Sequence, residues 1–343
     1  MRKHSVSCFL AITLTILVIT GFTVTITQTL TASAQTDSTF SIIWITDTQY
    51  LSASHPTYYD ALCRWIAANK INYNVQMVIH TGDIVDTEGN STQWLNANES
   101  MSILLNNGIS YCWDAGNHDY NATCWIGDQF GAFNPQAMQS KPYWVGNEFS
   151  GMNTAVRFDV NGWDCLIINI AYDANDTVLA WANSLLDSNP QSHVIVATHA
   201  YIDPQCRYDS WALNFKRTVL DVHANVFMTL SGHFHPTSGN RTRVGDRDEL
   251  LFNQQDAYGQ MGAASARILT FDTAKGTINV QTYVLYANEF LQDPNNNFSL
   301  QTTFHNDSAN QNVPEFPATV ILAAVLVFST SGLVIVAQKV KRY

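Results

Sequence analysis

Short apolar runs alternate with amphipathic segments along residues 41–286, and this pattern predicts most of the secondary structure. Runs rich in β-branched and aromatic residues predict strands at 41–46, 75–80, 109–113, 155–160, 165–171, 193–198, 226–230, 266–272 and 277–286. Apolar positions at helical spacing predict helices over 58–72, 91–107, 177–187 and 208–224. The first three strands alternate with helices, which predicts an α/β fold with parallel strands and right-handed crossovers. Residues 120–150 lack a clear period and are predicted to form a long loop or cap.

The N-terminal segment carries a targeting pattern. Arg2 and Lys3 precede an apolar run over residues 8–26, and residues 32–34 give a small-x-small cleavage pattern. Residues 1–34 are therefore predicted to be a signal peptide, with an uncleaved signal anchor as the alternative.

The C-terminal segment predicts a membrane anchor. Residues 318–337 carry no charge and precede a basic tail at 338–343, which predicts a transmembrane helix with its tail in the cytoplasm. Residues 293–317 are rich in Asn, Gln and Ser and are predicted to be a flexible stalk. The domain at 35–292 is therefore expected at the cell surface, outside the membrane.

The charge balance restricts the partners. The chain has 17 basic and 28 acidic residues, and five of the basic residues lie in the two ends, which leaves a net charge of −16 between them. This balance disfavours wrapping of a long polyanion, so long nucleic acid is not an expected partner, and no protein partner is indicated. Acceptor sequences for N-glycosylation fit an exported glycoprotein and lie at Asn90, Asn98, Asn121, Asn175, Asn240, Asn297 and Asn306.

Polar side chains with metal-binding chemistry follow five of the predicted strands. In chain order they are Asp47, Gly82-Asp83-Ile84-Val85-Asp86, Gly116-Asn117-His118-Asp119, His199 and Gly232-His233-Phe234-His235. Each motif alone has an ordinary explanation, because Asp and Asn often cap helices or form turns and a single His is usually packed or solvated. The carboxyl ends of parallel strands, however, meet at one edge of a sheet, where α/β proteins bind ligands. The five motifs together predict one metal site.

The order of these motifs resembles the calcineurin-like metallophosphoesterase superfamily, over about residues 41–286. Residues 252–272 also resemble the closing strands of extracellular members. The resemblance implies a four-layer α/β/β/α sandwich that holds two divalent metal ions of the Mn, Fe, Zn, Co or Ni type. It further implies a metallophosphoesterase, a hydrolase in which the dinuclear centre activates water for attack on a phosphoester.

The resemblance also implies roles for single residues. The implied ligands are Asp47, Asp83 and His235 for the first ion and Asn117, His199 and His233 for the second, with Asp83 bridging both. His118 would act as general acid toward the leaving group and Asp119 would orient it, while Asp86 would brace the Asp83 loop.

Gln49 departs from the family pattern, in which His commonly stands two residues after the first Asp. A carboxamide oxygen is a weaker and harder ligand than an imidazole. Three roles remain open for Gln49: it ligates the first ion through its oxygen, bonds a water molecule on that ion, or stands aside. Two metal ions are expected in each case.

A second function class uses the same fold without catalysis, as a binding ectodomain. Gln49, the glycosylation sequences and the aromatic insertion at 120–150 support this alternative, whereas the complete set of ligand-type residues opposes it. For an enzyme, the insertion would choose the substrate. Its seven aromatic residues and its only cation, Lys141, favour a small phosphoester with a flat or apolar leaving group such as a nucleoside, unless the rings only pack the insertion.

Overall fold

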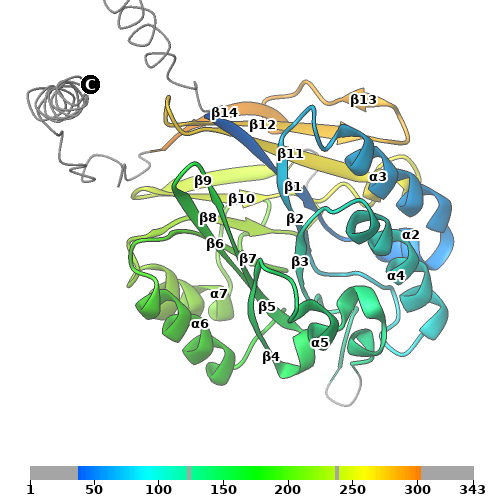
Figure 1. Cartoon of the computed structure of the whole chain (residues 1–343), viewed down its shortest axis with the longest axis horizontal. Helices are drawn as coiled ribbons and strands as arrows, with labels where there is room; N and C mark the ends of the chain where they lie inside the picture. The colour runs from blue at the N-terminus through cyan, green and yellow to red at the C-terminus, as the bar shows by residue number, and fades with distance from the viewer. Residues whose placement is uncertain (1–37, 122–124, 236–238, 303–343) are drawn as a thin grey trace, which may run out of the picture. The chain divides into compact units, whose positions relative to one another are not determined.

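Two seven-stranded β-sheets form the core of the domain in a computed structural model that describes residues 38–121, 125–235 and 239–302 (Figure 1). The first sheet has the order β13-β12-β11-β1-β2-β3, with β14 paired to β12. Its strands are β1 (Thr39–Ile45), β2 (Val75–Thr81), β3 (Tyr111–Asp114), β11 (Ser265–Asp272), β12 (Thr277–Val284), β13 (Glu289–Phe290) and β14 (Asn297–Gln301). The second sheet has the order β4-β5-β6-β7-β8-β10-β9. Its strands are β4 (Trp144–Glu148), β5 (Asn153–Val160), β6 (Trp163–Ile170), β7 (His193–Thr198), β8 (Val226–Ser231), β9 (Asn240–Val244) and β10 (Arg247–Leu251).

The directions of the strands agree with the alternating strand–helix units predicted from the sequence. β1, β2 and β3 are parallel neighbours, with Ile43 opposite Val78 and Ile79 opposite Cys112. β6, β7 and β8 are likewise parallel, and β10 joins β8 in the same direction. β11 runs antiparallel to β1 and forms a hairpin with β12. The parallel order and the final hairpin predicted from the sequence are therefore confirmed.

Helices cover the outer face of each sheet (Figure 1). The first sheet carries α2 (Gln49–Ser54), α3 (Pro56–Asn69) and α4 (Ser91–Asn106), and the second carries α6 (Asp176–Ser188) and α7 (Ser210–Phe215), which continues as the π-helical turn η4 (Lys216–Leu220). Side chains alternate along β1, so Ile43 and Ile45 join the helix-side core while Phe40 faces the second sheet, where its ring lies 5.0 Å from that of Trp163. The layers are thus helix, sheet, sheet and helix, and the predicted α/β sandwich is confirmed.

The insertion at 120–150 differs from the predicted loop. It contains α5 (Pro135–Met138), β4 and short 3-10 turns. Its rings pack inward, because Trp125 and Phe133 lie 5.2 and 5.6 Å from Trp94 of α4, and Trp144 lies 5.6 Å from Trp113 of β3. Of the two explanations that the sequence left open, these rings support packing of the insertion.

The C-terminal boundary of the domain also moves. β14 lies within the predicted stalk, where it pairs antiparallel with β12, so the fold extends through residue 302 and the predicted boundary at 292 is wrong. The predicted signal peptide (1–34), the transmembrane helix (318–337) and the basic tail (338–343) lie outside the described residues. Within the described ranges, every helix is too short or too polar to cross a membrane.

Candidate metal centre

Strained backbone turns present the candidate ligands at the strand ends. Asp47 follows β1, Asp83 follows β2 and His233 follows β8, and these residues have φ angles of 52°, 51° and 64°. A residue with a Cβ in this left-handed region costs about 1–3 kcal/mol, and such residues cluster at functional sites. Three candidate ligands therefore share a costly conformation that the surrounding structure must hold.

Two glycines make room for the carboxylates. A Cβ at Gly116 would lie 2.2 Å from Asp83 Oδ1, and a Cβ at Gly232 would lie 2.3 Å from Asp47 Oδ2. Both distances are far below van der Waals contact, so a larger residue would displace the carboxylate. The glycines that open the third and fifth motifs thus serve close approach between loops.

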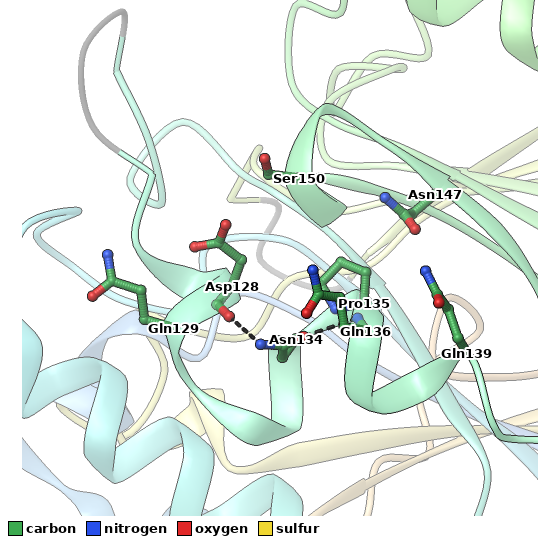
Figure 2. A pocket seen from close by; sticks show the side chains of 8 residues that line it. All are labelled: Asp128, Gln129, Asn134, Pro135, Gln136, Gln139, Asn147 and Ser150. Carbon is green, nitrogen blue, oxygen red and sulfur yellow. Dashed lines mark hydrogen bonds between the residues drawn. The ribbon is translucent and has the colours of Figure 1, made fainter.

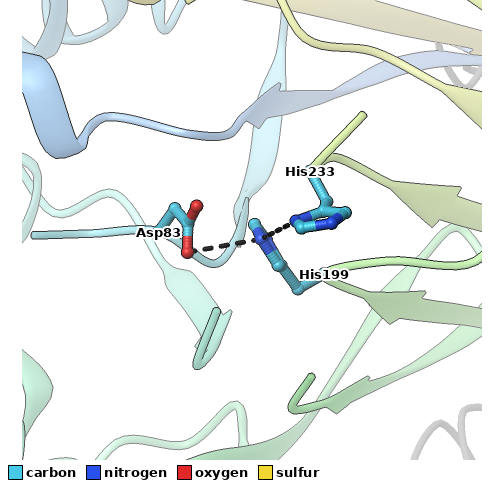
Figure 3. A group of neighbouring side chains, drawn as sticks. All are labelled: Asp83, His199 and His233. Carbon is cyan, nitrogen blue, oxygen red and sulfur yellow. Dashed lines mark hydrogen bonds and ion pairs between the residues drawn. The ribbon is translucent and has the colours of Figure 1, made fainter. Parts of the chain in front are cut away.

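Three candidate ligands converge on one ring nitrogen of a fourth, His199 (Figure 3 shows three of the four residues). His199 Nδ1 lies 2.8 Å from the carbonyl oxygen of Thr81, which can only accept, so Nδ1 carries a proton and Nε2 is the nitrogen that faces the site. Nε2 lies 3.3 Å from Asp83 Oδ1, 3.0 Å from Asn117 Oδ1 and 3.2 Å from His233 Nδ1. The Asp83 and Asn117 oxygens are acceptors that face this nitrogen, and a positive charge at Nε2 satisfies both of them.

In the protein alone, a proton supplies that charge. Burial of the His199 ring lowers its pKa, but the Asp83 carboxylate outweighs burial and raises the pKa to about 10. Burial raises the pKa of Asp83, and the His199 cation overcomes this and leaves it below its ordinary value. Burial and the same cation lower the pKa of His233 to about 4. The cluster therefore holds one bound cation in the form of a proton.

Asp47 and Gln49 lie on the β1 side of the cluster, and both are buried. Asp47 accepts hydrogen bonds from the Thr46 hydroxyl at 2.5 Å and from the His233 backbone N–H at 3.1 Å. Gln49 Nε2 donates to Asp83 Oδ2 at 3.3 Å, while Gln49 Oε1 is buried without a hydrogen-bond partner among the described residues. A buried amide oxygen without a donor is unusual and fits a cation as its partner.

His235 lies apart from the cluster. Its Nδ1 lies 2.6 Å from Asp256 Oδ2, its Nε2 contacts the Gln255 amide, and its side chain is 45% exposed. Among the described residues, only Asp83, His199 and His233 meet as a group of three acidic, cysteine or histidine ligands. The assignment of His235 to the first ion stays a prediction.

Asp119 and Asp86 make contacts that differ from the roles that the resemblance implied for them. The buried Asp119 carboxylate accepts the backbone N–H groups of Ile84 at 2.7 Å, Val85 at 2.9 Å and Gly116 at 2.7 Å, so it braces the Asp83 loop. His118 is instead oriented at Asp86, because its Nδ1 lies 2.9 Å from the Asp86 backbone oxygen. The resemblance implied that Asp119 orients His118 and that Asp86 braces the Asp83 loop. The sequence could not show which N–H groups face Asp119, because these contacts join residues 34 and 35 positions apart.

Tyrosines that the sequence did not single out border the cluster. The Tyr172 ring lies 5.4 Å from His233 and 6.0 Å from His199, and its carbonyl accepts a hydrogen bond from the Tyr120 hydroxyl. Beside them a cavity of about 240 Å³ is lined by Tyr120, Phe149 and Asp173 among others. Tyr172 follows β6 directly, so its place at a strand end was the available sequence signal.

Comparisons with known proteins identify the family of the chain. Residues 40–237 match the family model described as calcineurin-like phosphoesterase. Protein YvnB of Bacillus subtilis (strain 168) is 30% identical over 261 residues, which is 73% of this chain and 20% of YvnB, so the chain spans about a fifth of that relative.

One solved structure with a TM-score above 0.5 shares this fold at low identity. GAP50, the anchor in the inner membrane complex of Plasmodium, superposes with a TM-score of 0.52 at 13% identity, covering 78% of this chain and 90% of GAP50. Purple acid phosphatase PPD1 of yellow lupin (Lupinus luteus) gives 0.49 at 12% identity, covering 78% and 54%. With more than half of its length matched by the family model, the chain belongs to the calcineurin-like phosphoesterase family.

Proposed function

We propose that this protein is a metal-dependent phosphoester hydrolase. The observation that carries the proposal is the convergence of Asp83, Asn117 and His233 on His199 Nε2, a set of metal-ligand side chains that a cation would satisfy. Carboxylate, carboxamide and imidazole ligands together suit divalent transition metals. The buried oxygen of Gln49 and the space kept by Gly116 support the same conclusion.

The described residues fit one ion at the His199 cluster, and a second ion would need His235, which pairs with Asp256 here, as one of its ligands. One ion would be held by Asp83, Asn117, His199 and His233, and a second by Asp47, Gln49, Asp83 and His235. Two divalent ions of this kind, when bound, neutralise phosphoryl oxygens and make water a nucleophile near neutral pH. The His199 Nδ1–H bond to Thr81 fixes the tautomer that leaves Nε2 free for such an ion.

His118 would supply the leaving-group proton. Its backbone N–H donates to Asp83 Oδ1 at 3.0 Å, which ties it to the centre, and its Nδ1–H donates to the Asp86 carbonyl, so Nε2 carries the transferable proton. Burial lowers the pKa of His118, but the Asp86 carbonyl and nearby carboxylates raise it above the ordinary value. This shift favours the protonated form of the ring, which is the form that a general acid needs.

The electrostatics of the site favour a small substrate. The charged groups that act most strongly on Asp47, His199 and Tyr172 are all Asp or His residues, and none is Lys or Arg. A polyanion would need a cationic track beside the centre, and the acidic balance of the chain, 17 basic against 28 acidic residues, disfavours one. We therefore propose a small phosphoester as the substrate. The insertion's rings are divided: Trp125 and Phe133 pack against Trp94, whereas Tyr120 and Phe149 line the cavity beside Tyr172. A flat or apolar leaving group therefore stays part of the proposal.

The chain ends support an exported, membrane-tethered enzyme. The predicted signal peptide at 1–34 would direct export, and the uncharged run at 318–337 with its basic tail would anchor the domain on the outer side. Protease added to intact cells should then release active domain. Activity that appears only after lysis would contradict this orientation.

Metal content and hydrolysis test the activity. The purified full chain should carry about two transition-metal ions and hydrolyse p-nitrophenyl phosphate or its bis ester. His199→Ala should lose metal and turnover, whereas His223→Ala, a control at a histidine beside Asn183 on another face of the domain, should keep both. An inactive chain that Mn, Fe, Zn, Co and Ni all fail to reconstitute would rule the proposal out.

A further inference from the structure

The insertion at 120–150 carries an open polar hollow on its surface, separate from the metal centre. Its volume is about 390 Å³ (Figure 2). It is lined by Asp128, Gln129, Asn134, Pro135, Gln136, Gln139, Asn147 and Ser150. None of these residues belongs to the candidate metal centre or lines the cavity beside Tyr172. Ser150 is the chain neighbour of Phe149, which does line that cavity.

Carboxamides dominate this lining. Five of the eight residues are Asn or Gln, with one carboxylate, one hydroxyl and one proline. Asn134 is committed to the fold, because its Oδ1 caps α5 and its Nδ2 donates to the Asp128 carbonyl. The side chains of Gln129, Gln136, Gln139 and Asn147 form no hydrogen bond to another described residue. Each of these four amides offers two donors and a carbonyl acceptor to a ligand.

The wall of the hollow is held rigidly. Phe149, Ser150 and Gly151 have consecutive left-handed φ angles of 48°, 51° and 91°, a conformation that is costly for the first two. Two indoles hold this turn, since Trp125 Nε1 donates to the Ser150 carbonyl at 3.1 Å and Trp113 Nε1 donates to the Gly151 carbonyl at 2.8 Å. The insertion is thereby fixed to β3, and a preformed wall lowers the entropy that a ligand must lose.

Gly151 is needed for the same wall. A Cβ at this position would lie 2.3 Å from Pro135 Cγ, so only glycine lets the turn approach the start of α5. The strained turn and the proline therefore meet at the floor of the hollow, which fixes its shape.

The residues that line the hollow are unsuited to several classes of ligand and suited to one. An anion would meet Asp128 and no Lys or Arg, and a cation would find a single carboxylate. An apolar ligand would find only Pro135 and would leave the amides unpaired, which is unfavourable. A neutral polyhydroxylated ligand matches, because each hydroxyl both donates and accepts, as the amides do. We propose that this hollow is a binding site for a neutral saccharide.

Binding tests the site directly. The full chain, kept free of sugar-based detergents, is applied to an array of neutral mono- and oligosaccharides, and hits are titrated by saturation-transfer NMR. At least one saccharide should bind with a Kd below about 10 mM, the range of a few directed hydrogen bonds. If no saccharide in the array binds with a Kd below about 10 mM, the proposal is wrong.

Matched variants locate the binding. Gln139→Ala and Asn147→Ala should each weaken binding about five- to tenfold, as expected for loss of one or two hydrogen bonds. Asn72→Ala removes an exposed carboxamide in the segment after α3 and should leave the Kd unchanged. Circular dichroism checks that each variant is folded. Equal affinity in the two hollow variants and the wild type would overturn the assignment.

Enzyme kinetics distinguish a saccharide that is part of the phosphoester substrate from an independent glycan. If it is part of a phosphoester substrate, Asn147→Ala should raise KM for a sugar phosphate and leave kcat and p-nitrophenyl phosphate hydrolysis unchanged. If it is an independent glycan, array binding falls while all kinetic constants stay. Either result supports the site, and array binding remains interpretable if the chain proves to have no hydrolase activity.

Discussion

Replacing Asp119 by Asn tests the role that the structure gives this carboxylate. In the native protein its two oxygens receive three backbone N–H groups, from Ile84, Val85 and Gly116. An Asn can keep Oδ1 toward Ile84 and Val85, but its NH₂ group must then face the Gly116 N–H as donor against donor. Rotating the amide exposes the other two N–H groups to the same conflict. The substitution therefore loses at least one charge-assisted bond inside the protein.

The expected cost is about 3 kcal/mol, because a lost hydrogen bond costs roughly 1 kcal/mol and an unpaired buried N–H adds roughly 1–3 kcal/mol. For a domain of this size, about 2 °C of Tm follows each kcal/mol, so Tm should fall by about 6 °C. The Asp83 turn at φ 51° loses part of its support. Metal affinity should therefore fall by about 10- to 100-fold, as for other groups that orient metal ligands.

Thermal unfolding in the presence of a chelator measures the stability change, and titration of the same protein with Zn²⁺ measures the affinity. Asp86→Asn is the matched control, because the Asp86 carboxylate is 38% exposed and its backbone oxygen, which the substitution leaves in place, orients His118. The control should melt within about 1 °C of the wild type. If Asp119→Asn melts like the control and loses only kcat at saturating metal, Asp119 acts through His118 and the bracing role is refuted.

Three further predictions concern the same centre. His118→Ala should lower kcat by about 10²- to 10⁴-fold while atomic absorption still finds the bound metals, and unchanged turnover would remove His118 from the reaction. Because the pKa of His199 is raised to about 10, its proton is bound throughout the neutral range and a metal ion must displace it. Zn²⁺ affinity should therefore rise about tenfold per pH unit from about pH 6 to about pH 8, with about one proton released in calorimetry across two buffers, and a pH-independent Kd would contradict this. Gly116→Ala places a Cβ 2.2 Å from Asp83 Oδ1 and should abolish tight metal binding, whereas Gly146→Ala, where a Cβ meets no atom within 4 Å, should bind normally. Equal affinity in the two glycine variants would show that the Asp83 carboxylate is free to move.

The local pattern of the chain was sufficient for the elements that carry the site. The strand at 193–198 coincides with β7, and the helix predicted over 91–107 differs from α4 at one end by one residue, because apolar spacing and an N-cap at Asn90 are local properties. The β9–β10 hairpin was not predicted, because its strands lack a clear apolar pattern. Its strands contain Arg247 and Glu249, which are buried in an ion pair of 3.0 Å, so charge obscured the strand pattern.

The sequence by itself determined that Asp83, Asn117, His199 and His233 follow separate strands, and parallel strands bring such ends together. Only the tertiary structure decided which side chain serves which neighbour. Asp119 meets N–H groups 34 and 35 residues away, and His235 meets Asp256 21 residues away. These partners depend on where loops close over one another, which involves angles at a few strained residues and leaves no periodic trace in the chain. Hydrophobic periodicity fixes the strands and helices, whereas the partners of single polar groups are set when those elements pack.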